Sequence, residues 1–199
     1  MPPLDRASGY PQTVIALWIV LGVLALVAIV FVIGFNRLVR LRNEVETGWS
    51  NIDVQLNRRA DLIPNLVEAV KGYAAHERGV FEAITAARTA LLGASTPAAA
   101  GQANDVLTAA IGKLFAVAEA YPDLKASQNF LRLQDDLTDT EDKISAARRY
   151  YNATVMRYNT KVQSFPGLLY ASALGFKARE FFAAEADAHS VPQVDLAPQ

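Results

Sequence analysis

Hydrophobic residues are distributed along this chain in two different patterns. Residues 14–35, VIALWIVLGVLALVAIVFVIGF, form one apolar run without a charged side chain. After that run, apolar residues recur every three or four positions, which is typical of amphipathic helices. No useful length of the remaining chain alternates apolar and polar residues with the period of two that a half-buried strand requires. The pattern therefore predicts an all-α protein.

The apolar run is long enough to cross a membrane. At about 1.5 Å per residue it extends roughly 33 Å, which matches the hydrocarbon core of a bilayer. A buried core helix and a cleaved signal peptide are the two alternatives. The apolar region of a signal peptide has only about 7–15 residues and precedes small residues at a cleavage site. This run is longer and ends in Phe35-Asn36-Arg37, so we interpret it as an uncleaved signal anchor.

The charges that flank the apolar run predict its orientation. Arg37, Arg40 and Arg42 follow it, whereas Arg6 beside Asp5 precedes it. Basic residues favour the cytoplasmic side, so we expect a single-pass membrane protein with its C-terminal domain in the cytoplasm. The expected organisation is a short extracytoplasmic segment at 1–13, the anchor at 14–35, a helical bundle at 36–182 and a disordered tail at 183–199.

The amphipathic pattern after the anchor predicts four long helices. The first continues from the anchor without a break to about Gly72, with a kink at Pro64. The second covers 75–92. The third begins at Pro97 with Thr96 as its N-cap and runs to about residue 120, and the fourth covers 127–163. Short connections between them favour an antiparallel up-down four-helix bundle, into which the transmembrane helix continues.

The apolar and aromatic segment at 165–182 should lie near the bilayer surface, because the fourth helix returns toward the membrane. Two alternatives remain open for it. The segment either packs only in the core, or lies at the interface with its cations facing lipid headgroups. The residues that would form such an interfacial segment are Phe176, Lys177, Arg179, Phe181 and Phe182.

Polar residues are unusually dense in WSNIDVQLNRRADLIPNLVEAVKGY at 49–73, and some of them recur every seven positions. Amide and tyrosine side chains form a similar pair of repeats on the fourth helix. These residues either form an internal hydrogen-bonded ladder that fixes the register of two helices, or a surface that binds another copy or a partner. The candidate surface comprises Trp49, Asn51, Arg58, Arg59, Asp61, Asn65, Tyr151, Asn152, Tyr158 and Asn159.

Composition excludes several classes of function. The chain has no cysteine and only two histidines, His76 and His189, and its net charge is -1. Disulfides, thiol catalysis and cysteine metal sites are therefore absent, and no basic excess indicates nucleic acid. No Glu-x-x-His pair of the kind found in di-metal bundles occurs, nor does a glycine-rich phosphate loop. We predict no catalytic, metal-binding or cofactor-binding residue and no small-molecule substrate.

Three segments resemble the LemA family of bacterial membrane proteins. They are NRLVRLRNEVETGWSNIDVQLNRRADLIPNLVEAVKGYAAHE at 36–77, LTDTEDKISAARRYYNATVMRYNTKVQSFP at 137–166 and GFKAREFF at 175–182. Phe35 stands where members often have a tyrosine. The resemblance implies a membrane anchor followed by a cytoplasmic helical bundle, and it supplies no enzymatic activity. Some members are associated with magnetosome membranes, and others are encoded near membrane proteases or quality-control proteins.

These observations favour a non-enzymatic, homo-oligomeric scaffold at the cytoplasmic surface of the membrane. Its expected partners are the lipid bilayer and further copies of itself. A monomeric or dimeric adaptor for a signalling, protease or quality-control client is the alternative. A bundle enzyme with a metal-carboxylate site is a distant third possibility.

Overall fold

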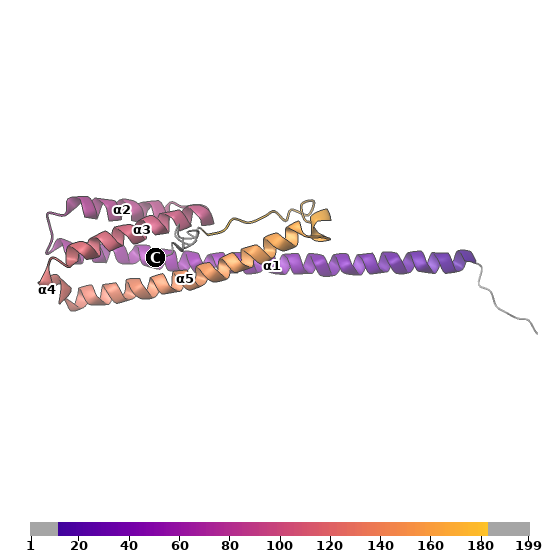
Figure 1. The fold of residues 1–199 in the computed structure, drawn as a ribbon, viewed down its shortest axis with the longest axis horizontal. Coiled ribbons are helices and arrows are strands. Elements are labelled where there is room, and N and C mark those ends of the chain that lie inside the picture. The colour runs from indigo at the N-terminus through magenta and orange to yellow at the C-terminus, as the bar shows by residue number, and fades with distance from the viewer. Residues whose placement is uncertain (1–11, 183–199) are drawn as a thin grey trace, which may run out of the picture.

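The computed structural model describes residues 12–182 and is built from helices, with no strand in that range. Four long helices, α1 (Gln12–Lys71), α2 (Arg78–Leu92), α3 (Pro97–Ala118) and α5 (Gln128–Gln163), run alternately up and down (Figure 1). A short helix, α4 (Pro122–Lys125), connects α3 to α5, and a 3-10 turn, η1 (Gly167–Leu169), follows α5. The predicted all-α bundle with an N-terminal apolar helix is confirmed.

Helix α1 continues without interruption from the apolar run into the bundle. It passes through Pro64 and ends at Lys71, directly before Gly72. Its first half stands clear of the other helices (Figure 1), and its large apolar side chains between Ile15 and Ile33 are all at least 42% exposed. A soluble core helix would bury such side chains, so this part of α1 has the length and the surface of a membrane span.

The bundle has four helices only in the half that lies far from the apolar run. Helices α2 and α3 are shorter than α5, so α1 and α5 alone continue toward the membrane end (Figure 1). The core between them consists of the apolar positions that recur along each helix. Leu38, Ile52, Ile63, Leu66, Ile84, Leu107, Leu114 and Ile144 are at most 2% exposed. Such burial of apolar area is the main force that holds the helices together.

Local signals in the sequence account for the ends of the shorter helices. The hydroxyl of Thr96 accepts a hydrogen bond of 3.2 Å from the backbone N–H of Ala99, and Pro97 takes the first helical position. Helix α2 begins at Arg78, three residues later than predicted, because the chain after Val70 first forms turns closed by Ala74 and Glu77. The connection between α3 and α5 begins a further helical turn at Pro122, which takes the first helical position of the short helix α4.

After η1 the chain reverses and runs back along α1 and α5, away from the apolar run (Figure 1). Gly175 permits the reversal because its φ is +80°, a conformation that side chains with a Cβ rarely adopt. Phe176 and Phe182 then enter the core, where they are 3% and 1% exposed. The returning segment thus covers part of the two-helix half of the bundle that α2 and α3 leave open.

Candidate interaction surfaces

The polar residues predicted on α1 divide between its outer and inner faces. Asn51, Arg58, Asp61 and Asn65 are exposed and lie on the side of α1 that faces away from the core. Together with Thr47, Val54 and Glu68 they follow alternating spacings of four and three, and all seven are exposed. We call these seven residues the outer stripe. Because spacings of four and three keep side chains on one face of a helix, the stripe is a continuous surface along α1.

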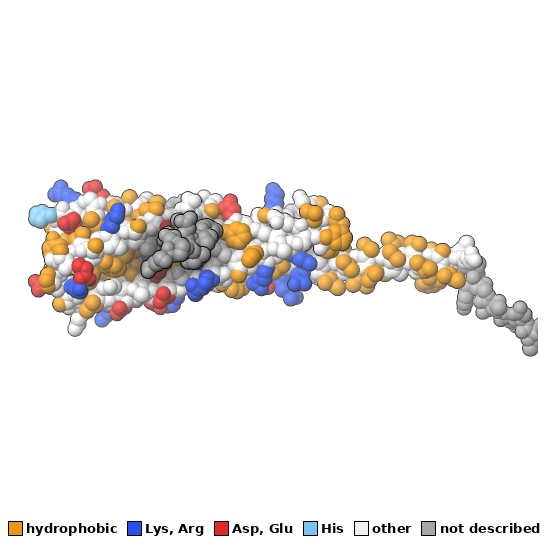
Figure 2. Space-filling view, in the orientation of Figure 1, with side chains coloured by type: hydrophobic (Ala, Val, Ile, Leu, Met, Phe, Trp, Pro, Cys, Tyr) orange, Lys and Arg blue, Asp and Glu red, His pale blue; other side chains and the backbone are white. Residues whose placement is uncertain are grey.

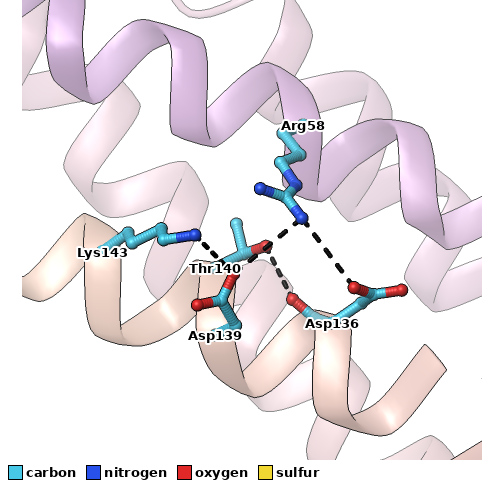
Figure 3. Close-up of polar contacts among 5 residues, drawn as sticks. All are labelled: Arg58, Asp136, Asp139, Thr140 and Lys143. Carbon is cyan, nitrogen blue, oxygen red and sulfur yellow. Dashed lines mark hydrogen bonds and ion pairs between the residues drawn. The ribbon is translucent and has the colours of Figure 1, made fainter. Parts of the chain in front are cut away.

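Arg58 connects the outer stripe to α5 (Figure 3). One of its guanidinium nitrogens lies 3.8 Å from a carboxylate oxygen of Asp136 and 3.8 Å from one of Asp139. Lys143, one turn further along α5, donates a hydrogen bond of 2.7 Å to Asp139 and thereby lowers the pKa of that carboxyl. These side chains are all more than 40% exposed, so water screens the pairs.

Arg59, the neighbour of Arg58, is not part of any exposed surface. It is 3% exposed and donates a hydrogen bond of 2.7 Å to the side-chain oxygen of Asn104 on α3. It also forms an ion pair with Glu141 on α5. Burial lowers the pKa of Arg59, while the nearby carboxylates of Glu141 and Asp105 raise it. The prediction that placed Arg59 on a binding surface is therefore wrong, because this guanidinium joins three helices inside the bundle.

The two asparagines predicted on α5 hold the returning C-terminal segment. Asn152 donates to the carbonyl oxygen of Phe182 at 3.1 Å and accepts from its N–H at 3.0 Å. Asn159 makes the same pair of bonds with Arg179, at 2.9 and 2.8 Å. The ladder that the sequence suggested between two helices is instead a ladder between one helix and an extended chain. Both amides are occupied by it, which removes them from the candidate binding surface.

Aromatic side chains fill the space beneath this ladder. Tyr151 and Tyr158 are 2% and 1% exposed, so they are core residues and not surface residues. Tyr151 donates a hydrogen bond of 2.9 Å to the carbonyl oxygen of Glu180. Trp49 is half-buried, and its ring centroid lies 6.1 Å from that of Tyr151 and 6.5 Å from that of Phe182. Burial raises the pKa of both tyrosines.

The predicted interfacial residues are also divided by the structure. Phe176 packs edge-on against Phe35 with the ring centroids 5.7 Å apart, and the guanidinium of Arg42 lies 5.8 Å from its ring centroid. Arg179 forms an ion pair of 3.3 Å with Glu46 on α1. Phe176 and Phe182 cannot face lipid in this arrangement, because both rings are buried in protein. Lys177 and Phe181 are exposed.

A groove lies between α1 and α5 where the apolar run meets the bundle. Its volume is about 950 Å³, and Arg37, Arg40, Arg157 and Lys161 line it together with Glu44. On each helix the residues that line the groove recur every three or four positions, so each helix presents one of its faces to the groove. The arginines of α1 were noted in the sequence only as an orientation signal, and their juxtaposition with Arg157 and Lys161 was not predicted.

The described residues hold no group of three or more histidine, aspartate or glutamate side chains that could bind a metal ion. His76 is exposed in the connection between α1 and α2. His189 lies outside residues 12–182, as do the whole tail predicted at 183–199 and residues 1–11 of the segment predicted at 1–13.

Comparison with protein families matches residues 48–196 to the LemA family, which is about three quarters of the chain. The chain belongs to the LemA family. The match begins twelve residues later than the segment that carried the resemblance and extends beyond Phe182 into the tail. For this LemA-family chain, membership together with the exposed apolar half of α1 supports an association with the membrane.

Several curated proteins are similar to this LemA-family chain over most of its length. Magnetosome protein MamQ 2 of Paramagnetospirillum magneticum is 27% identical over 191 residues, which cover 82% of this chain and 70% of that protein. Magnetosome protein MamQ of Magnetospirillum gryphiswaldense is 26% identical and covers 84% of this chain and 72% of its own length. Protein LemA of Metamycoplasma hominis is 29% identical over 134 residues, which cover 65% of this chain and 60% of that protein.

Proposed function

We propose that this protein is a non-enzymatic, homo-oligomeric scaffold that stands on the cytoplasmic surface of a bacterial inner membrane. The observation that carries this proposal is the continuity of α1, which is one helix from Gln12 to Lys71. A continuous helix holds the bundle in a fixed direction relative to its membrane span. Copies that share one membrane therefore stand parallel, with the same residues at the same height.

The outer stripe is the surface on which such copies would meet. It is exposed along α1 and carries basic, acidic and amide side chains together with one exposed apolar residue, Val54, which is 59% exposed. Arg58 and Asp61 differ in height by about 4.5 Å, so the arginine of one copy can reach the aspartate of a parallel neighbour. Membranes that hold many copies favour this lateral contact because every span restricts its bundle to one orientation.

The hydrogen-bonded polar groups of the bundle support the non-enzymatic part of the proposal. Arg59, Asn104 and Glu141 bind one another across three helices, and Asn152 and Asn159 bind the returning chain. Each of these groups has a structural partner. The cytoplasmic orientation rests on Arg37, Arg40 and Arg42, which follow the apolar run directly.

The test is the mass of the full-length protein in a mild detergent, measured by light scattering and corrected for bound detergent. We expect a discrete assembly of several copies. Val54→Arg should dissociate it, because a contact through the outer stripe would bury an unpaired charge. Val106→Arg on α3 is the matched control, since Val106 is 58% exposed and lies outside the stripe; this variant should keep the mass of the wild type.

Three outcomes of this measurement would count against the proposal. A monomeric wild-type protein would contradict the scaffold. Dissociation by Val106→Arg but not by Val54→Arg would move the contact to another face of the bundle. A monomer or dimer that copurifies with one signalling or protease client would favour the adaptor instead.

A further inference from the structure

We propose that the groove between α1 and α5 binds the headgroup of an anionic phospholipid, and that the turn after α5 enters the same leaflet beside the acyl chains. This inference depends on the membrane span and not on self-assembly. Its elements are the charge of the groove, its height relative to the span, and the exposed apolar turn next to it.

The groove carries a strong excess of positive charge. Four basic residues and one acidic residue line it, together with the hydroxyls of Thr160 and Ser164 and the amide of Asn36. The acidic residue, Glu44, forms an ion pair with Arg157, in which the nitrogen and the oxygen are 3.8 Å apart. Within the described part of the chain, the structure records no ion pair for Arg37, Arg40 or Lys161. Three cations, the hydroxyl of Thr160 and the amide of Asn36 thus line one open space, which suits a phosphate group. The hydroxyl of Ser164 donates instead to the carbonyl oxygen of Thr160, at 2.6 Å.

The groove lies at the height of the lipid headgroups. Ile33, near the end of the apolar run, forms its membrane end, and Asn36, Arg37 and Arg40 follow. The rise from Asn36 to Arg40 is about 6 Å, which matches the thickness of roughly 5–7 Å that headgroups add to each leaflet. A phosphate in the groove would therefore lie in the layer where lipids carry theirs.

An apolar turn adjoins the groove directly after Ser164. Phe165, Leu168 and Leu169 are 77%, 63% and 71% exposed. The ring of Tyr170, next in the chain, packs edge-on against Phe31 of the apolar run with centroids 4.9 Å apart. The turn therefore lies beside the last residues of the span, about 6 Å inside its end at Phe35, where acyl chains would surround it.

The neighbouring positions of these two features identify the occupant as a lipid. Figure 2 shows basic side chains beside a group of hydrophobic side chains, at the place where the bundle ends and the apolar part of α1 continues alone. Free phosphate would bind only the groove and would make no contact with the apolar turn. A phospholipid satisfies both, because its phosphate is joined to acyl chains. Of the two predicted headgroup ligands, Arg179 binds Glu46 instead, and Lys177 is exposed but does not line the groove.

The test uses the full-length protein in mild detergent and two lipids labelled on an acyl chain, phosphatidylglycerol and phosphatidylcholine. Binding is followed by fluorescence anisotropy. The groove variant is Arg37→Gln with Arg40→Gln and Lys161→Gln. The control is Arg78→Gln with Lys113→Gln and Arg132→Gln, which removes the same charge from exposed positions at the far end of the bundle. Helical circular dichroism confirms that each variant is folded.

We expect wild type to prefer phosphatidylglycerol and the groove variant to lose that preference. Each cation near a membrane surface contributes about fivefold in affinity, so the triple substitution should weaken binding of phosphatidylglycerol by about 100-fold. The control should stay within about twofold of wild type, because its charges lie far from the groove. Replacing each basic residue by the other basic type, as Arg37→Lys, Arg40→Lys and Lys161→Arg, keeps the positive charges and should keep most of the affinity.

The apolar turn is tested by Leu168→Asn with Leu169→Asn. This variant should weaken binding of both lipids and leave their ratio unchanged, because acyl chains are common to both. Equal losses in the groove variant and in the control would show that net charge alone attracts the lipid, and would overturn the proposal. Displacement of phosphatidylglycerol by millimolar inorganic phosphate would identify a site for free phosphate instead, and would also overturn it.

Discussion

Replacement of Arg59 by leucine tests whether the buried guanidinium holds the bundle together. Arg59 on α1 binds Asn104 on α3 and Glu141 on α5, and it is 3% exposed. Leucine would fill part of the space but would leave the side-chain oxygen of Asn104 without its donor and the carboxylate of Glu141 without its cation. Both losses affect only the folded state, so the free energy of unfolding should fall.

The structure sets the size of this loss. Breaking a buried ion pair by removing one partner costs about 3–5 kcal/mol. The side chain of Glu141 remains 31% exposed, so water can solvate it in part, and we expect a loss near the lower limit, about 3 kcal/mol. For a chain of this size that corresponds to a fall in melting temperature of about 6–12 °C. The measurement is thermal unfolding of the full-length protein in detergent, followed by helical circular dichroism.

Arg58→Leu is the matched control, because Arg58 is the preceding residue on the same helix. Its ion pairs are 3.8 Å long, and its side chain is 47% exposed, so its loss should cost less than about 1 kcal/mol. Glu141→Gln added to Arg59→Leu should recover part of the stability, since it removes the unpaired charge. If Arg59→Leu costs no more than Arg58→Leu, the buried pair does not stabilise the bundle and the reasoning is refuted.

Two further predictions concern the returning segment. Because burial raises the pKa of Tyr151 and Tyr158 in the folded state, the unfolded chain loses these protons first, and the free energy of unfolding should fall as the pH rises above about 10. Tyr151→Phe with Tyr158→Phe should make that fall shallower in urea titrations at two pH values, whereas an unchanged slope would contradict the assignment. Gly175→Ala should lower the free energy of unfolding by about 1–2 kcal/mol in the same titrations, because a residue with a Cβ is strained at the φ of +80° found there, although no neighbouring atom would contact that Cβ. Gly112→Ala within α3 also has open space around the added Cβ, and its backbone is helical, so this change should be neutral or stabilising.

The sequence predicted the helices well because each depends on signals that lie close together in the chain. The uncharged run at 14–35, Thr96 before Pro97, and the apolar period of 127–163 each specify an element without reference to the rest of the chain. The largest shift of a predicted helix end is at the start of α2, because the turns between Val70 and Arg78 are closed by backbone hydrogen bonds that no side-chain pattern predicts.

The partners of the polar side chains could not be predicted in the same way. Periodicity assigns a residue to a face but does not identify the segment that covers this face. A single step along a helix turns by about 100°, which is enough to place Arg58 in water and Arg59 among three helices. The amides of Asn152 and Asn159 matched the spacing of a helix ladder, yet their partners lie beyond Gly175. Only the reversal of the chain there brings those partners within reach.

The unbroken course of α1 also makes the bundle a lever. The part of α1 beyond the apolar run, from Asn36 to Lys71, is about 54 Å long, and it is one continuous helix that passes through Pro64. A span adapts to bilayers of different thickness by tilting. A change of about 10° in that tilt would move the far end of the helix sideways by about 9 Å. Small variations in bilayer thickness are thereby converted into large displacements of the distal four-helix region.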